Sequence, residues 1–171
     1  MKTLVKILSL SILVFFASCK KDDPNFNQDD AVGTWNLTAV SCTDGSSSVS
    51  GSGIPPINST FTVSGKNYNS VVVFNADGTY ESQGSYTAVI KINYQGTIQE
   101  SEEDTGVFEG SGTWNISGNT FTTTTAGETS TGTIEELTSS KMVVAMSINE
   151  TETDSGFTTT TKGTYRFTLT K

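Results

Sequence analysis

Residues 80–94, with the sequence YESQGSYTAVIKINY, decide the fold class of this chain. Their even-numbered positions hold aromatic, aliphatic or small residues, and their odd-numbered positions are mostly polar or charged. A period of two, with one apolar and one polar face, is typical of an antiparallel sheet that has water on one side. Because the segment is longer than an ordinary strand, we expect a bend or a bulge at Gly84.

The same pattern continues outward along the chain. Alternation recurs over residues 35–39, 142–148 and 165–169, and no stretch after Val32 has the three-and-four spacing of an amphipathic helix. Short turn sequences separate these segments at 75–78 (NADG), 94–97 (YQGT), 117–119 (SGN) and 139–140 (SS). The expected strands lie near 32–42, 69–75, 78–94, 97–116 (interrupted), 119–126, 130–138, 141–150 and 156–170. We therefore predict an all-β fold, an antiparallel up-and-down β-barrel of about eight strands whose closure removes exposed edges.

One connection of the predicted barrel is long. Residues 44–59 contain Gly45, three consecutive serines, a glycine-rich piece at 51–53 and the pair Pro55-Pro56. This composition predicts a loop, because it lacks alternation and is rich in residues that break strands. The loop would be either a lid over the barrel or a surface insertion.

The N-terminus has the layout of a secretion signal. Lys2 and Lys6 precede or interrupt an apolar run over residues 4–16, which is too short and too close to the N-terminus for an ordinary transmembrane helix. We therefore predict that residues 1–18 are a signal peptide. The polar residues that follow, up to residue 30, include Pro24 and show no periodicity, so residues 19–30 are predicted to be a flexible tether. The domain then spans 31–171.

The end of the apolar run resembles a lipoprotein processing site. Phe16-Ala17-Ser18-Cys19 is similar to the lipobox of bacterial lipoproteins, with Phe in place of the usual Leu. The resemblance implies that Cys19 becomes the N-terminus and carries acyl chains such as palmitate on its sulfur and amine. The following residues, 20–23 (KKDD), resemble the signal that sends some lipoproteins to the cell surface. The expected location is the outer membrane, lipid-anchored, with surface and periplasmic orientations both open. The alternatives are an ordinary signal peptide and a solvated charged spacer.

Size and charge restrict the function. Cleavage before Cys19 leaves 171 − 18 = 153 residues, enough for one domain with a core. Without Lys2 and Lys6 the chain has 10 − 2 = 8 basic residues against 18 acidic ones, a net charge of about −10. Such an acidic chain repels phosphate backbones, so we expect no nucleic-acid partner.

The chain contains no histidine, which makes an enzyme or a transition-metal site unexpected. Histidine is the commonest general base, the usual activator of a Ser or Cys nucleophile and a main ligand of zinc. We therefore expect no catalytic residue, no metal and no cofactor. With Cys19 lipidated, Cys42 has no partner for a disulfide, and we expect it to be a small, part-buried strand residue.

Four motifs in order suggest a family. Gly33-Thr34-Trp35 is followed by 74–80 (FNADGTY), 112–116 (GTWNI) and 134–142 (IEELTSSKM). With the lipobox, this order over residues 31–171 resembles the lipocalin-like domain of Gram-negative bacterial lipoproteins. The resemblance implies a β-barrel of about eight strands and no particular activity. The chain lacks the second strand–turn signature and the disulfide of true lipocalins. Gly-Thr-Trp-Asn occurs twice, and each Trp is expected to plug the barrel end.

The apolar faces supply the candidate ligand-binding residues. The expected interior residues are Trp35, Tyr80, Tyr86, Phe108, Trp114, Phe121, Met142, Met146, Tyr165 and Phe167. They can either fill the barrel or line a pocket, since Ser82, Gly84, Gly110 and Gly112 on the same faces leave room. The acidic groups at 100–104, 135–136 and 150–154 match no calcium-loop spacing and are expected to be solvated.

Two functions remain open at this stage. The leading prediction is a monomeric, lipid-anchored envelope protein whose barrel binds a small apolar or amphipathic ligand. The alternative is a structural or interaction protein with a filled barrel, whose loops contact an envelope partner or a surface glycan.

Overall fold

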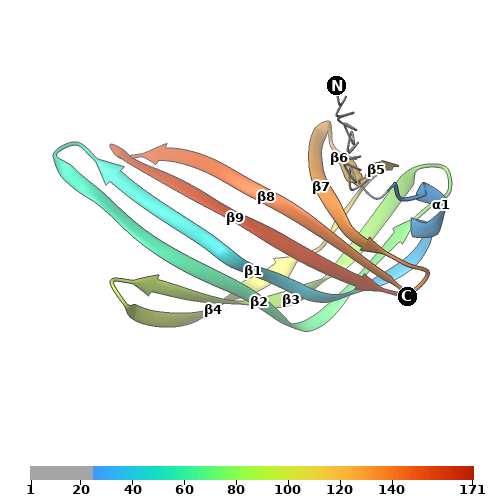
Figure 1. The fold of residues 1–171 in the computed structure, drawn as a ribbon, viewed down its shortest axis with the longest axis horizontal. Coiled ribbons are helices and arrows are strands. Elements are labelled where there is room, and N and C mark those ends of the chain that lie inside the picture. Colours follow the sequence, from blue (N-terminus) through green and yellow to red (C-terminus); the bar gives the residue numbers. More distant parts are fainter. Residues whose placement is uncertain (1–24) are drawn as a thin grey trace, which may run out of the picture.

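The computed structural model describes residues 25–171, with the side chains of 100–104 outside the description. A short helix, α1 (Gln28–Ala31), is followed by nine strands (Figure 1). They are β1 (Gly33–Gly51), β2 (Ile54–Phe74), β3 (Thr79–Tyr94), β4 (Thr97–Val107), β5 (Gly110–Ser117), β6 (Thr120–Thr125), β7 (Glu128–Leu137), β8 (Lys141–Asp154) and β9 (Phe157–Thr170).

The strands form one antiparallel sheet in the order β2-β1-β9-β8-β7-β6-β5-β3-β4, and an additional β2–β3 pairing closes eight of them into a ring. The predicted all-β barrel of about eight strands is therefore confirmed. β4 and β5 together are the interrupted strand expected over 97–116. β3 pairs with β5 at Ser82–Gly110 and with β4 at Ser85–Val107, and the Phe108 N–H donates to the Gly84 carbonyl (2.9 Å) between them.

Gly84 has an unusual backbone conformation, but the bulge predicted at this position lies on the neighbouring strand. Its φ of +107° is one that L side chains rarely adopt, and a Cβ added there would overlap the backbone oxygen of Asn69. The extra residue of the bulge belongs to β2, where the pairing with β3 shifts between Lys66 and Asn69. The predicted tight turns are confirmed, and Gly78 has the positive φ (+81°) that its hairpin requires.

The prediction of a loop over 44–59 was wrong. β1 and β2 run through this region as one long hairpin with its turn at 52–53. β2 pairs with β3 only from the Thr60–Asn93 pair onward, so the first part of β2 is an edge strand. Pro55 and Pro56 are tolerated there because an edge strand has hydrogen-bond partners on one side only. Gly45 is covered by the ring of its cross-strand partner Phe61, which replaces the missing side-chain contact.

The ring closes over only part of its height. The predicted removal of all edges therefore fails, because in the described pairings β4 has β3 as its only neighbour and β8 beyond Ala145 has only β9. The far ends of these strands extend as hairpins away from α1 (Figure 1). Exposed acidic residues on β8, at positions 150, 152 and 154, protect that edge against pairing with other chains.

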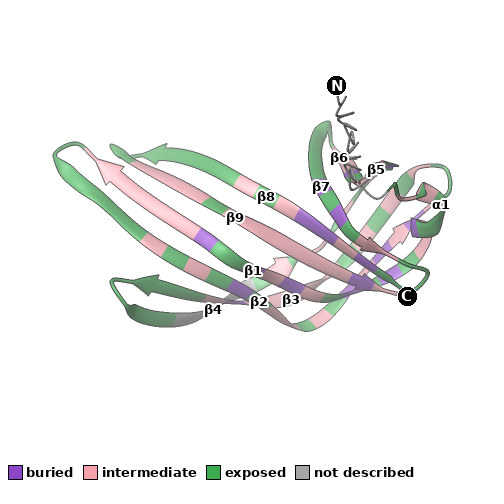
Figure 2. Cartoon of the chain, in the orientation of Figure 1, coloured by how far each residue is buried: buried purple, intermediate pink, exposed green. Residues whose placement is uncertain are grey.

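Buried residues gather at the end of the barrel near α1 and the C-terminus, which we call the closed end (Figure 2). Trp35 is fully buried there, and its Nε1–H donates to the Ala31 carbonyl (2.7 Å). Trp114 is 3% exposed and donates from Nε1 to the Asn75 carbonyl (3.1 Å). Both Gly-Thr-Trp tryptophans thus plug the barrel end, as expected.

The residues just before β1 belong to this closed end. The Phe26 N–H donates to the Gly118 carbonyl (3.0 Å), and Gln28 Oε1 accepts from the Ile116 N–H (3.3 Å). Lys171 Nζ donates to the Val32 carbonyl (2.9 Å) and lies 4.4 Å from the Trp35 ring centroid. Residues 25–30 therefore pack on the barrel, unlike the flexible tether expected over 19–30. The predicted signal peptide, Cys19 and residues 20–24 lie outside the described residues.

Candidate ligand cavity

Aromatic rings fill the closed end and form a floor inside the barrel. Phe74 lies at the centre of this cluster, with its ring centroid 4.9 Å from that of Trp114 and 5.6 Å from that of Phe121 in an edge-to-face arrangement. These spacings are typical of favourable aromatic pairs. Met142 is fully buried beside them, so this part of the barrel is a packed core.

Above this floor the barrel interior is hollow. A cavity of about 230 Å³ is lined by residues from β2, β3, β6, β8 and β9 and by the junction between β4 and β5. Apolar side chains dominate its wall, which consists of Val72, Phe74, Tyr80, Ser82, Val107, Phe108, Glu109, Phe121, Thr123, Val144, Met146, Phe167 and Leu169. The barrel is therefore neither fully packed nor fully open: its closed end is solid and its middle holds a cavity.

The polar atoms of the cavity wall are few and mostly paired. The Tyr80 hydroxyl is hydrogen-bonded to Thr125 Oγ1, and Ser82 Oγ donates to the Gly110 carbonyl (3.3 Å). Glu109 is exposed and lies at the rim. Within the described part of the chain, no Lys or Arg lines the cavity. Its chemistry therefore suits an apolar, uncharged molecule.

All ten predicted interior residues belong to the core cluster or pack against it, but only half of them line the cavity. Tyr80, Phe108, Phe121, Met146 and Phe167 line it. Trp35, Trp114 and Met142 are packed in the closed end, and Tyr86 and Tyr165 are part-buried and do not line the cavity. Sequence reasoning did not name Val72, Phe74, Val144 and Leu169 for the pocket. Leu169 lies between two threonines, so its alternation was a usable signal, whereas Val72 and Val144 have apolar neighbours on both sides.

Comparison with protein-family models now identifies the domain. Residues 32–144, which are more than half of the chain, match the model described as a lipocalin-like domain. The chain belongs to the lipocalin-like domain family. The comparison with curated proteins and the comparison with solved structures each found no match. In general terms, a lipocalin-like fold is a barrel that binds ligands. The cavity inside the barrel of this protein agrees with that.

Two part-buried tyrosines belong to the interior of the lipocalin-like barrel outside the cavity wall. Tyr86 stacks on Tyr68 with ring centroids 6.0 Å apart and covers Gly106, and Tyr165 stacks on Phe167 at 6.5 Å. Burial raises the pKa of Tyr86 and that of Tyr165 above the ordinary value. Both hydroxyls therefore stay protonated and neutral at physiological pH.

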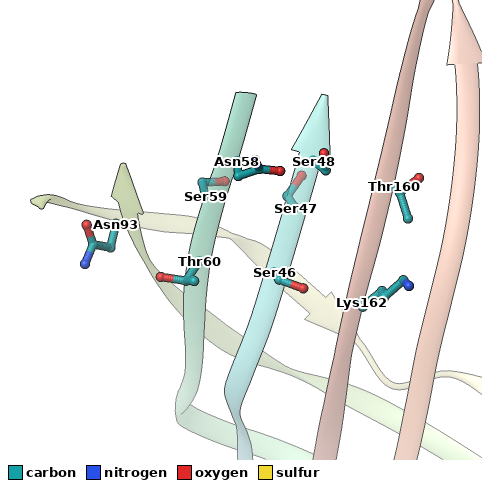
Figure 3. A pocket seen from close by; sticks show the side chains of 9 residues that line it. All are labelled: Ser46, Ser47, Ser48, Asn58, Ser59, Thr60, Asn93, Thr160 and Lys162. Carbon is teal, nitrogen blue, oxygen red and sulfur yellow. The ribbon is translucent and has the colours of Figure 1, made fainter. Parts of the chain in front are cut away.

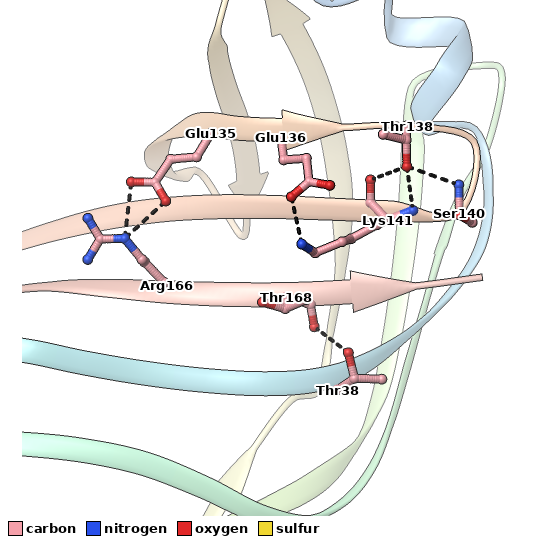
Figure 4. A network of polar contacts seen from close by, with 8 residues as sticks. All are labelled: Thr38, Glu135, Glu136, Thr138, Ser140, Lys141, Arg166 and Thr168. Carbon is pink, nitrogen blue, oxygen red and sulfur yellow. Dashed lines mark hydrogen bonds and ion pairs between the residues drawn. The ribbon is translucent and has the colours of Figure 1, made fainter.

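Of the acidic groups noted in the sequence, residues 135–136 form ion pairs on the outside of the lipocalin-like barrel (Figure 4). A bulge in β7 between Ile134 and Glu136 makes Glu135 the extra residue of the strand. Glu135 accepts from Arg166 Nε (3.0 Å), and Glu136 accepts from Lys141 Nζ (2.6 Å). All four side chains are well exposed, so each pair contributes little stability.

Cys42 is a strand residue, as predicted, and it is almost completely buried. It is 1% exposed, and a Cβ added at Gly163 would lie 2.9 Å from its sulfur. Burial raises the pKa of the Cys42 thiol, because the thiolate would lose its hydration. Its neighbour Asp44 accepts a hydrogen bond from the Thr164 N–H (2.9 Å), which lowers the pKa of that carboxyl.

A second, larger hollow of about 600 Å³ lies among the hairpin extensions (Figure 3). Its wall is polar throughout and consists of Ser46, Ser47, Ser48, Asn58, Ser59, Thr60, Asn93, Thr160 and Lys162. Small-molecule sites are usually lined by apolar residues, so this hollow offers little driving force for an apolar ligand. Within the described residues, no group of three or more His, Cys, Asp or Glu is placed to hold a metal ion, and no helix is long and apolar enough to cross a membrane.

Proposed function

We propose that this protein is a lipid-anchored envelope lipoprotein whose lipocalin-like barrel binds a small apolar or amphipathic molecule. The cavity of about 230 Å³ above the aromatic floor carries this proposal. An apolar cavity of about 150 Å³ is known to bind benzene, and pockets for drug-sized ligands start at about 300 Å³. The ligand is therefore larger than benzene and smaller than a typical drug molecule.

Binding, rather than catalysis, is the chemistry proposed for the cavity. Its wall holds the hydroxyls of Tyr80 and Ser82, which are already hydrogen-bonded, and the hydroxyl of Thr123. It has one rim carboxylate, Glu109, and no second carboxylate among its wall residues that would form an acid–base pair with it. The chain contains no histidine that could activate a nucleophile. Measured turnover of any compound that is lost on Glu109→Gln would contradict this part of the proposal.

The methionine methyl groups offer a direct assay for ligand binding. Met146 lines the cavity, whereas Met142 is fully buried in the closed end and does not. The assay uses a protein of residues 20–171, which include the ring, the core and the closed end. A ligand library is added to it, and binding is followed by the ¹³C-methyl NMR signal of each methionine. A true ligand shifts the Met146 signal saturably and leaves the Met142 signal nearly unchanged. A library in which no compound selectively shifts Met146 would sink the proposal.

A matched pair of variants locates the binding. Val144 lines the cavity and is 4% exposed, whereas Val143 is its neighbour on β8 and lies on the opposite face. Val144→Phe places a ring in the cavity and is expected to abolish binding, while Val143→Phe is expected to retain it. Loss of binding in both variants, or in neither, would place the ligand elsewhere.

The membrane anchor is proposed from the lipobox resemblance at Cys19. Two or three acyl chains would hold the protein permanently, since each buried CH₂ contributes about 0.8 kcal/mol. Cys19→Ser is expected to release the protein from membranes, and protease added to intact cells is expected to remove the domain. A Cys19→Ser chain that still sediments with membranes would contradict the anchor, and resistance to protease until the outer membrane is opened would contradict surface exposure.

A second candidate function is contact with a surface glycan through the hairpin extensions. The polar hollow among β1, β2, β3 and β9 favours it, because its hydroxyl, amide and ammonium groups match the hydroxyls of a carbohydrate. Ser48→Phe together with Asn58→Phe would block this hollow without touching the cavity. If glycan binding occurs and survives this double change, the hollow is not its site.

A further inference from the structure

Ser70 carries an unpaired hydroxyl on the inner face of the barrel; it lies two residues along β2 from the wall residue Val72 and is not itself one of the wall residues. Ser70 is 3% exposed, and its Oγ has no hydrogen-bond partner among the described residues. A buried hydroxyl without a partner costs free energy, so such groups are rare in native proteins. Ser70 is therefore either a site for a bound molecule or an isolated defect of the core.

The register of β2 and β3 places Ser70 beside the cavity wall. Side chains two residues apart in a strand share a face, and Val72, two residues after Ser70, lines the cavity. Across the ladder Val72 pairs with Ser82, another wall residue, and Ser70 pairs with Gly84. The residue opposite Ser70 thus has no side chain that could cover its hydroxyl.

The local backbone explains why Ser70 lacks a partner. The Gly84 carbonyl accepts a hydrogen bond from the Phe108 N–H (2.9 Å), so this acceptor is already in use. The other hydroxyl on the same face, Ser82 Oγ, donates to the Gly110 carbonyl (3.3 Å). Of the two neighbouring serines, one is paired within the protein and one is left with its full hydrogen-bonding capacity.

We propose that the ligand of this cavity is an uncharged apolar molecule with one hydroxyl or carbonyl group, which hydrogen-bonds to Ser70 Oγ. This inference rests on the proposed ligand-binding function and specifies the ligand class. A carboxylate ligand is excluded by charge: no Lys or Arg lines the described cavity, the rim bears Glu109, and the whole chain has a net charge of −8. A pure hydrocarbon would leave the Ser70 hydroxyl unpaired.

Three probes of the same skeleton test the proposal: 3-phenyl-1-propanol, propylbenzene and 3-phenylpropanoate. Their dissociation constants are measured from the Met146 methyl signal in residues 20–171. The alcohol is expected to bind about three- to tenfold more tightly than the hydrocarbon, as one net hydrogen bond contributes roughly 0.5–1.5 kcal/mol. The carboxylate is expected to bind more weakly than both, by at least tenfold.

Ser70→Ala separates the role of the hydroxyl from that of cavity shape. This variant is expected to remove the preference for the alcohol and to leave the affinity for propylbenzene unchanged. Ser64→Ala, which changes an exposed serine of β2 outside the cavity wall, is the matched control, and there the preference is expected to persist. A preference that survives Ser70→Ala, or an alcohol that binds wild type no more tightly than the hydrocarbon, would overturn the assignment of Ser70.

The outcomes also distinguish this inference from the proposed function. If propylbenzene and the alcohol bind equally, and Val144→Phe abolishes both, the cavity binds ligands and only the role of Ser70 is refuted. If none of the three probes shifts Met146, the inference is refuted for these probes, and the library screen decides the proposed function separately.

Discussion

Ser70→Ala is predicted to stabilise the ligand-free barrel, although it removes a side-chain group from the core. The Ser70 hydroxyl is 3% exposed and unpaired among the described residues, so folding removes its hydration without replacing it. Relief of that desolvation is worth about 1–3 kcal/mol. The void left by one hydroxyl, roughly 15–20 Å³, costs about 0.4–0.5 kcal/mol at the usual cost per unit of cavity volume. The net effect is a stabilisation of about 1 kcal/mol, or an increase in Tm of roughly 2–4 °C.

The assay is urea unfolding of residues 20–171, followed by tryptophan fluorescence, with Ser82→Ala as the control. Ser82 Oγ donates to the Gly110 carbonyl, so its removal is expected to destabilise the fold by about 0.5–1.5 kcal/mol. The two serines therefore give opposite signs. A Ser70→Ala variant that is less stable than wild type by 1 kcal/mol or more would refute the reasoning, because it would mean that the hydroxyl is satisfied in the free protein. The same change is expected to weaken alcohol binding, so stability and function oppose each other at this position.

Three further predictions concern other parts of the barrel. Cys42 is expected to resist thiol reagents at pH 8 in the folded protein and to react within minutes in 6 M guanidinium; rapid labelling of the folded form would contradict its burial. The side-chain and backbone hydrogen bonds from Thr79 lower the pKa of Asp77, so their stabilisation is present above pH 3.8 and is lost as the pH falls through the lowered pKa. Asp77→Asn should thus reduce the acid sensitivity of unfolding, and an unchanged pH profile between 2 and 4 would show that the interaction is negligible. Lys171→Met removes the ammonium that contacts the Val32 carbonyl and the Trp35 ring and should cost about 1 kcal/mol in thermal unfolding, whereas an unaltered Tm would show that the C-terminus does not hold the closed end.

The parts of the fold that alternate strongly were predictable from the sequence. Residues 80–94 lie in β3, and the turn at 75–78 joins it to β2 as expected. The predicted inward face is confirmed for Tyr80 and Tyr86, which pack against the core. Farther along the strand it fails, because Ile92 and Tyr94 are 40% and 42% exposed and Val89 of the other face is buried. The hairpin over 44–59 was missed because its strands extend past the closed ring, where both faces of the sheet meet water and no apolar alternation is required. Pro55 reinforced the error, since its tolerance depends on the edge position of that segment, which only the pairing reveals.

The candidate site could be predicted only in part. The sequence named large inward-facing residues, but whether they fill a barrel depends on the volume between them, which composition does not determine. Phe121 and Met142 have the same strand-face pattern, yet one forms the cavity floor and the other lies in the packed end. The lack of a hydrogen-bond partner for the Ser70 hydroxyl could not be predicted from the sequence either. It depends on Gly84 lying opposite in β3 and on the Gly84 carbonyl accepting from the Phe108 N–H.

The central claim is that a ligand-sized cavity lies between a packed closed end and the open hairpins, and xenon tests it most directly. Xenon enters dry apolar cavities without needing a specific recognition group. In residues 20–171, the Met146 methyl signal is expected to shift saturably with xenon pressure, the Met142 signal much less, and Val144→Phe is expected to abolish the response. Equal, small and non-saturating shifts at both methionines would show that the barrel is filled and would contradict the account.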